Sequence, residues 1–104
     1  MYFDIRSGHV NLRSDHRDYI EERLDRSLGR MSSRISRVTL HLDDVNGPKG
    51  GADIRCLVEA HLVRAGHVVA EVTAGDIRSA VDLAAERLSS RIRKEIGRAS
   101  CRER

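Results

Sequence analysis

The chain has 104 residues and a formal net charge of +3, with 39% hydrophobic, 34% charged and 3% aromatic residues. This length predicts one domain with a single modest core. So few aromatic side chains argue against a protein that binds single strands by base stacking. No apolar run approaches the roughly 18 residues of a membrane span, and the first residues are typical of a strand rather than a signal peptide. We therefore expect a cytoplasmic protein without a membrane partner.

The last nine residues, 96–104, differ from the rest of the chain. Their sequence, IGRASCRER, resembles the in-frame translation of a sequencing-library adapter. They carry a net charge of +2, which leaves only +1 for residues 1–95. We therefore expect a domain over 1–95 and a non-native tail over 96–104, with the natural C-terminus missing.

The first part of the chain predicts a strand followed by a helix. Residues 2–7 alternate apolar and polar side chains, which is the pattern of a half-buried strand. Apolar residues then recur at helical spacing and predict a helix over 14–31, with Ser14 or Asp15 as its N-cap. These helical apolar positions are Ile20, Leu24, Leu28 and Met31.

A long β-hairpin dominates the middle of the chain. The stretch 42–56 contains the only proline, three of the eight glycines and two adjacent aspartates, and alternating sequences flank it on both sides. This pattern predicts strands over 34–44 and 53–64 joined by a glycine-rich loop. We expect that loop to be a hairpin tip, because it lacks the Gly-Lys-Ser/Thr ending and following helix of a nucleotide-binding P-loop.

The final third predicts one more strand and a second helix. A turn at Ala65 and Gly66 leads into a strand over 67–73, and Asp76 is a suitable N-cap for a helix over 77–94. The order β-α-β-β-β-α then predicts an α+β two-layer sandwich, with a four-stranded mixed sheet and both helices on one face. The other face of the sheet would be mostly polar and would show Thr39, His41, Arg55, Leu57, Glu59, His61, Val69 and Glu71.

Each predicted helix carries a basic stripe beside its apolar face. At about 100° per residue, three basic side chains share one flank of each helix. If the helices pack side by side, the two stripes would form one basic track able to bind the phosphates of a folded RNA. The alternative is a solvated surface with local ion pairs. The candidate RNA-binding residues are Arg23, Arg26 and Arg30 on the first helix, Arg87, Arg91 and Lys94 on the second, and Arg34 and Arg37 beyond the end of the first.

Other chemistry finds little support in the sequence. Histidines and acids of the outer sheet face have no close-spaced pair typical of zinc sites, so we expect no metal. Cys56 lies at an inward position between two apolar residues and is expected to be a core side chain rather than a nucleophile. No catalytic constellation can be argued from spacing, so we expect neither an enzyme nor a cofactor nor a small-molecule substrate.

Two segments of the sequence resemble a known family. The segment SRISRVTLHLDDVNGPKGGADIRCLVEAHL and the helix entry TAGDIRSAVDLAAERL, together with the β-α-β-β-β-α order, resemble the ribosome hibernation-promoting factor and ribosome-associated translation inhibitor family. The resemblance covers residues 1 to about 94. It implies a monomeric, cytoplasmic protein that binds the small ribosomal subunit in its decoding region, contacts ribosomal RNA through its helices and silences the ribosome under stress.

Two other functions remain open at this level. A generic double-stranded RNA-binding module also packs helices on one face of a meander. A protein-interaction domain could use the outer sheet face or an exposed edge strand instead of RNA.

Overall fold

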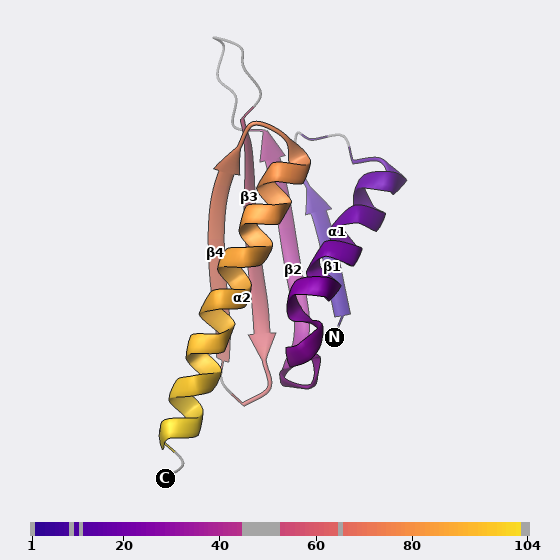
Figure 1. Cartoon of the computed structure of the whole chain (residues 1–104). Helices are drawn as coiled ribbons and strands as arrows, with labels where there is room; N and C mark the ends of the chain where they lie inside the picture. The colour runs from indigo at the N-terminus through magenta and orange to yellow at the C-terminus, as the bar shows by residue number, and fades with distance from the viewer. Residues whose placement is uncertain (1, 9, 11, 45–52, 65, 103–104) are drawn as a thin grey trace.

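The computed structural model describes residues 2–8, 10, 12–44, 53–64 and 66–102, the last six of these by their backbone only. The predicted glycine-rich loop at 45–52 lies outside the described residues. The elements follow the predicted β-α-β-β-β-α order, with a short 3₁₀ helix, η1, added after the first α-helix (Figure 1). They are β1 (Tyr2–Ser7), α1 (Ser14–Leu28), η1 (Gly29–Arg34), β2 (Ile35–Asp44), β3 (Ile54–Leu62), β4 (Gly66–Ala74) and α2 (Ile77–Arg102).

The sheet has the strand order β1-β2-β3-β4. β1 pairs with β2 in parallel, as a strand-helix-strand crossover requires, whereas β2, β3 and β4 form an antiparallel meander. Side chains of alternate residues therefore lie on opposite faces, and every second residue of β3 from Ile54 to Leu62 is buried. The α+β sandwich predicted from the sequence is confirmed.

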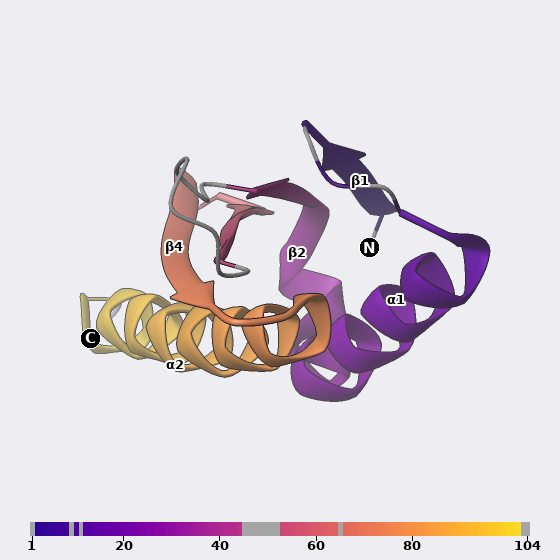
Figure 2. The same ribbon diagram turned by 90° about the horizontal axis from the view of Figure 1, so that it is seen from above.

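Both helices cover one face of this sheet (Figure 2). The core lies between the two layers and is made of aliphatic side chains, as the low aromatic content requires. Ile20, Leu24 and Leu28 from α1 meet Val81 and Leu88 from α2 in this layer, and all five are fully buried. None of the eight residues predicted for the outer sheet face is buried, which confirms that this face is turned to solvent.

The boundaries of the helices differ from the prediction. Residues 29–34 form η1 instead of extending α1, and the N-cap of α1 is Arg13, whose backbone N–H donates to Nδ1 of His16 at 3.3 Å. α2 continues to Arg102 rather than ending near residue 94, and Ile96 packs against the core. The boundary expected at residue 95 is therefore not visible as the end of a helix.

Candidate nucleic-acid interface

α1 and α2 run parallel and are joined by a polar seam along their contact. The Asp82 carboxylate of α2 accepts hydrogen bonds from the Tyr19 hydroxyl at 2.5 Å and from Nε of Arg23 at 3.1 Å. Arg23 also donates to the Ser27 hydroxyl, and its side chain is only 20% exposed. Arg23 is therefore held between the helices rather than presented on the surface.

The seam extends in both directions from Asp82. Toward the start of α2, the Arg78 guanidinium lies 5.0 Å from the centre of the Tyr19 ring, a cation-π contact. Toward its end, the Ser89 hydroxyl donates to the Ser27 carbonyl at 3.4 Å. The hydrogen bond to Asp82 is the main cause that raises the pKa of Tyr19 above its usual value. These contacts fix how the two helices lie against each other.

Arg87 and Arg91 lie on the opposite flank of α2. Nη1 of Arg87 donates to the Glu71 carbonyl of β4 at 3.3 Å, and Nη1 of Arg91 donates to the Val69 carbonyl at 3.0 Å. Arg23 of the α1 stripe thus meets Asp82 of α2, while Arg87 and Arg91 of the α2 stripe face the edge of the sheet. The two stripes do not form the single track that the sequence predicted, because helix α2 itself separates them.

In the structure, most of the basic residues gather at one end of the molecule and not along one flank of the helices. Both helices run toward the end of the sheet where β2 begins and where β3 turns into β4, and α2 continues past that end (Figure 1). Ile35 of β2 pairs with Leu62 of β3 there. The segments 26–37, 61–64, 66–67 and 91–96 lie at this end, and they contain one acidic residue, Glu95. We call this region the basic end. Its arginines and lysine are Arg26, Arg30, Arg34, Arg37, Arg64, Arg91, Arg93 and Lys94.

All eight basic side chains of this end are exposed. Arg26 pairs with Glu22 at 3.1 Å, and Nη2 of Arg37 lies 3.5 Å from Nε2 of His61. Five of the eight make no ion pair or side-chain hydrogen bond with any residue that the structure describes, which leaves their donors available to a ligand. These five are Arg30, Arg34, Arg64, Arg93 and Lys94.

Sequence reasoning missed Arg64 and Arg93. Arg64 lies in the turn between β3 and β4 with a φ of 70°, and the Val63 N–H beside it donates to the Arg34 carbonyl at 2.8 Å. That bond brings the turn next to η1, a proximity that no local pattern reveals. Arg93 belongs to neither stripe, but its place one residue before Lys94 near the end of the apolar pattern was a usable signal.

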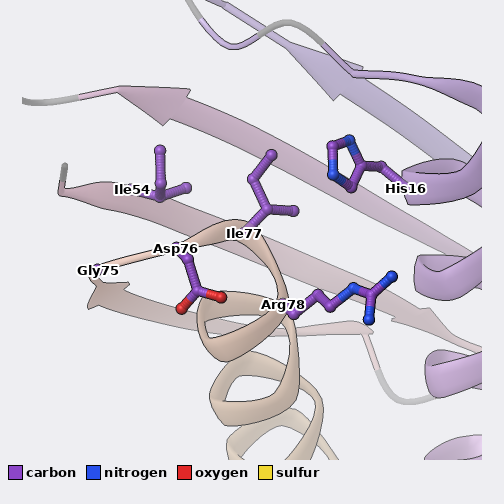
Figure 3. Close-up of a pocket in the computed structure, with 6 residues that line it drawn as sticks. All are labelled: His16, Ile54, Gly75, Asp76, Ile77 and Arg78. Carbon is purple, nitrogen blue, oxygen red and sulfur yellow. The ribbon is translucent and has the colours of Figure 1, made fainter.

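A pocket of about 340 Å³ lies at the other end of the helix layer. Figure 3 shows the Arg78 side chain reaching from α2 toward α1, with the His16 ring opposite it. Asp76 adds a carboxylate beside the Arg78 guanidinium, and two isoleucines contribute to the wall. The lining residues are His16, Ile54, Gly75, Asp76, Ile77 and Arg78.

The histidine cluster of the outer face is partly assembled. Glu59 lies between two histidines, with Oε1 3.3 Å from Nε2 of His61 and Oε2 3.5 Å from Nε2 of His67. These groups pair with one another, and no set of three or more His, Cys, Asp or Glu among the described residues is arranged to hold a metal ion. Cys56 is fully buried, and burial raises its pKa to about 12, which makes it an inert core thiol.

No helix in the described part of the chain has the length and hydrophobicity to cross a membrane.

Comparison with known proteins identifies the family to which the chain is similar. The family described as "Sigma 54 modulation protein / S30EA ribosomal protein" matches residues 3–100. No curated protein sequence matches the chain significantly.

Two solved structures share the fold. The N-terminal domain of Protein Y from Thermus thermophilus superposes with a TM-score of 0.72 at 20% identity, over 88% of this chain and 93% of that one. A ribosomal subunit interface protein from Coxiella burnetii gives a TM-score of 0.73 at 18% identity, over 93% of this chain and 99% of that one. At such identities these similarities establish the fold alone.

Proposed function

Since the chain belongs to the family of sigma 54 modulation and S30EA ribosomal proteins, we propose that it binds the small ribosomal subunit in its decoding region and inhibits translation under stress. Membership confirms the family resemblance found in the sequence, and it makes the protein a ribosome-associated modulator rather than a member of an enzyme family. The Coxiella burnetii relative is described as a ribosomal subunit interface protein, which supports a ribosomal partner. We place its action in the cytoplasm, as a monomer.

The basic end is the observation that carries this proposal. Arginine forks match phosphate oxygens, and each phosphate contact releases counterions from the nucleic acid. Five basic side chains that no described residue pairs with come together from three segments of the chain, and they form a surface that fits a folded RNA backbone rather than a base sequence. One acidic residue in the same region leaves this positive charge largely uncompensated.

We assign ribosomal RNA contacts to the exposed residues of the basic end other than Arg91. Three residues predicted from the sequence are left out of this assignment. Arg23 instead holds α1 against α2 through Asp82, and Arg87 and Arg91 donate to carbonyls at the edge of the sheet. The proposed contacts are Arg26, Arg30, Arg34, Arg37, Arg64, Arg93 and Lys94.

Co-sedimentation with purified small ribosomal subunits at low and physiological salt tests this function. We expect salt-dependent binding that competes with transfer RNA. The double variant Arg30→Ala/Arg34→Ala should bind more weakly, and the slope of log affinity against log salt should fall by about 1 for each phosphate that the variant no longer neutralises. Both side chains are exposed, so the fold should not change.

The matched control is the double variant Arg13→Ala/Arg78→Ala, which removes the same charge from the opposite end of the helix layer. It should bind with nearly unchanged affinity. Equal loss in both double variants would mean that net charge, not the basic end, drives binding. Absence of binding by the unchanged protein would refute the ribosomal function, and equal affinity for plain duplex RNA would indicate a generic double-stranded RNA-binding module.

A further inference from the structure

Arginines from the helices cover both edges of the sheet. β1 and β4 are the edge strands, and an edge presents unpaired N–H and C=O groups to which another strand can bind. Nη1 of Arg17 in α1 donates to the Ile5 carbonyl of β1 at 3.4 Å. Arg87 and Arg91 of α2 donate to two carbonyls of β4, at 3.3 and 3.0 Å. The helices therefore satisfy edge acceptors that regular strand pairing leaves open.

The geometry of β4 shows which groups form its free edge. In an antiparallel strand, the N–H and C=O of one residue point to the same side, and the side alternates along the strand. The carbonyls of Val69 and Glu71 accept hydrogen bonds from the arginines, so the backbone N–H and C=O groups of these two residues point away from β3. Their side chains lie on the outer sheet face, where Val69 is 36% exposed. By the same alternation, His67 and Thr73 also belong to the free edge.

We propose that the β4 edge is a self-complementary strand-addition surface for a second copy of this chain, and that Arg87 and Arg91 keep it closed. A two-fold axis midway between the two β4 strands, level with Val69, sets this residue opposite Val69 of the second copy. The same antiparallel register sets His67 opposite Glu71 twice. A central valine pair flanked by two histidine–glutamate pairs is a favourable cross-strand arrangement. The two-fold axis makes the interface isologous, because both copies contribute the same residues.

The arginines oppose this pairing in two ways. Each guanidinium occupies a carbonyl that a second β4 needs as an acceptor, and it stands where the backbone of that strand would lie, about 4.8 Å away. Pairing would also bring α2 of both copies to the seam, with Arg87 and Arg91 of each copy close together. Charged groups placed over an edge are a known means by which proteins prevent edge-to-edge association.

Sedimentation velocity of the double variant Arg87→Ala/Arg91→Ala over a range of concentrations tests the proposal. The unchanged protein should keep the mass of one chain, and the variant should approach the mass of two. In the associated variant, the N–H groups of Val69 and Glu71 should exchange with deuterium at least about tenfold more slowly, because they become paired. Adding Val69→Pro should restore the monomer, since proline removes an outward N–H at an edge.

Two controls distinguish the loss of the arginine–carbonyl contacts at the β4 edge from the loss of positive charge. Arg93→Ala/Lys94→Ala removes the same charge from α2 and should stay monomeric, and Arg87→Gln/Arg91→Gln keeps side-chain donors and should associate less than the alanine variant. A monomeric alanine variant overturns the proposal, as does association of the unchanged protein through β4 or association without protection of the two amides. If the double variant fails to fold, the single alanine variants replace it under the same criteria. None of these readouts depends on ribosome binding, so either proposal can fail alone.

Discussion

At the scale of single residues, Asp82 has the widest influence on the helix layer. Its carboxylate accepts hydrogen bonds from both Tyr19 and Arg23, so one α2 side chain positions two side chains of α1. Arg23 looked like an RNA contact in the sequence because its stripe contains only arginines. The acidic partner lies 59 residues away along the chain and could be found only in three dimensions.

Replacing Asp82 with asparagine should lower the pKa of Tyr19 toward its usual value. The hydrogen bond to the charged carboxylate is the main cause of the raised pKa, and the variant removes that charge. Ultraviolet titration in a Tyr2→Phe background would report Tyr19 alone, since the chain has two tyrosines. We expect the free energy of unfolding to fall by only about 1 kcal/mol, because the carboxylate is 43% exposed.

The control for this titration is Glu86→Gln, which removes a negative charge one turn farther along α2. It should leave the Tyr19 titration nearly unchanged. An identical shift in both variants would mean that general electrostatics, rather than the Asp82 hydrogen bond, sets the Tyr19 pKa.

Cys56 should make stability depend on alkaline pH. The folded state keeps the Cys56 proton up to a pKa of about 12, whereas an unfolded cysteine loses it from about pH 8.5 upward. The folded state thus binds more protons in this window, and the free energy of unfolding falls as pH rises. Below pH 8.5 both states are protonated, and the contribution is fully present.

Denaturation between pH 7 and pH 10.5 would measure this effect in a Cys101→Ser background. The protein with Cys56 should lose up to about 1.4 kcal/mol per pH unit more than its Cys56→Ala counterpart at the alkaline end. Thiol reagents should modify Cys56 only as fast as the protein opens. Parallel pH dependences in the two proteins, or rapid modification under native conditions, would contradict the buried thiol.

At the scale of elements, α2 has two distinct faces. Leu88 is fully buried between the layers, while Leu83 on the same helix is 44% exposed. In the sequence, Val81, Leu88 and Ile92 recur at helical spacing and Leu83 falls outside this stripe, which agrees with the burial of Leu88 and the exposure of Leu83.

The variant Leu88→Ala should therefore destabilise the protein by about 2–5 kcal/mol, since it removes buried atoms and leaves a cavity. The matched variant Leu83→Ala should change stability by no more than about 0.5 kcal/mol. Urea denaturation of both variants measures the difference. Similar losses would show that Leu83 is packed, and a small loss at Leu88 would show that the core relaxes around the cavity.

At the scale of the whole molecule, the parallel helices decide where positive charge gathers. Each helix carries basic residues toward its C-terminal end, where they also complement the helix dipole. Both helices return from the same end of the sheet, so their basic ends meet beside the β3–β4 turn (Figure 1). Acidic residues such as Asp15 and Asp76 lie toward the other end.

Removing residues 96–104 tests whether residues 1–95 form the domain. The fully buried core residues lie between Ile20 and Ile92, so the shortened chain should fold with the same secondary structure. We expect a loss of about 1 kcal/mol, because Ile96 is only partly buried against the core. Thermal unfolding measures this loss, with a chain ending at Ile96 as the control. Failure of the shortened chain to fold would place the domain boundary beyond residue 95.

The sequence by itself determined the elements, their order, the layer architecture and the buried positions. These properties follow from local periodicity, since a strand repeats every two residues and a helix every 3.6, and they need no knowledge of distant partners. The family came instead from the resemblance of two segments to known members, and the family match over residues 3–100 confirmed it. The sequence did not predict η1 or the extension of α2. A short 3₁₀ helix and a helix end without a stop signal leave only a weak pattern of apolar residues.

Only the tertiary structure decided which basic residues are available to a ligand. Arg23 lies in a seam with Asp82, Arg87 and Arg91 cover the β4 edge, and Arg64 comes to the basic end through a turn. The angle of a residue around its own helix is a local property. What that flank faces depends on the packing of elements far apart in the chain, and that packing separated the predicted stripes and assembled the basic end.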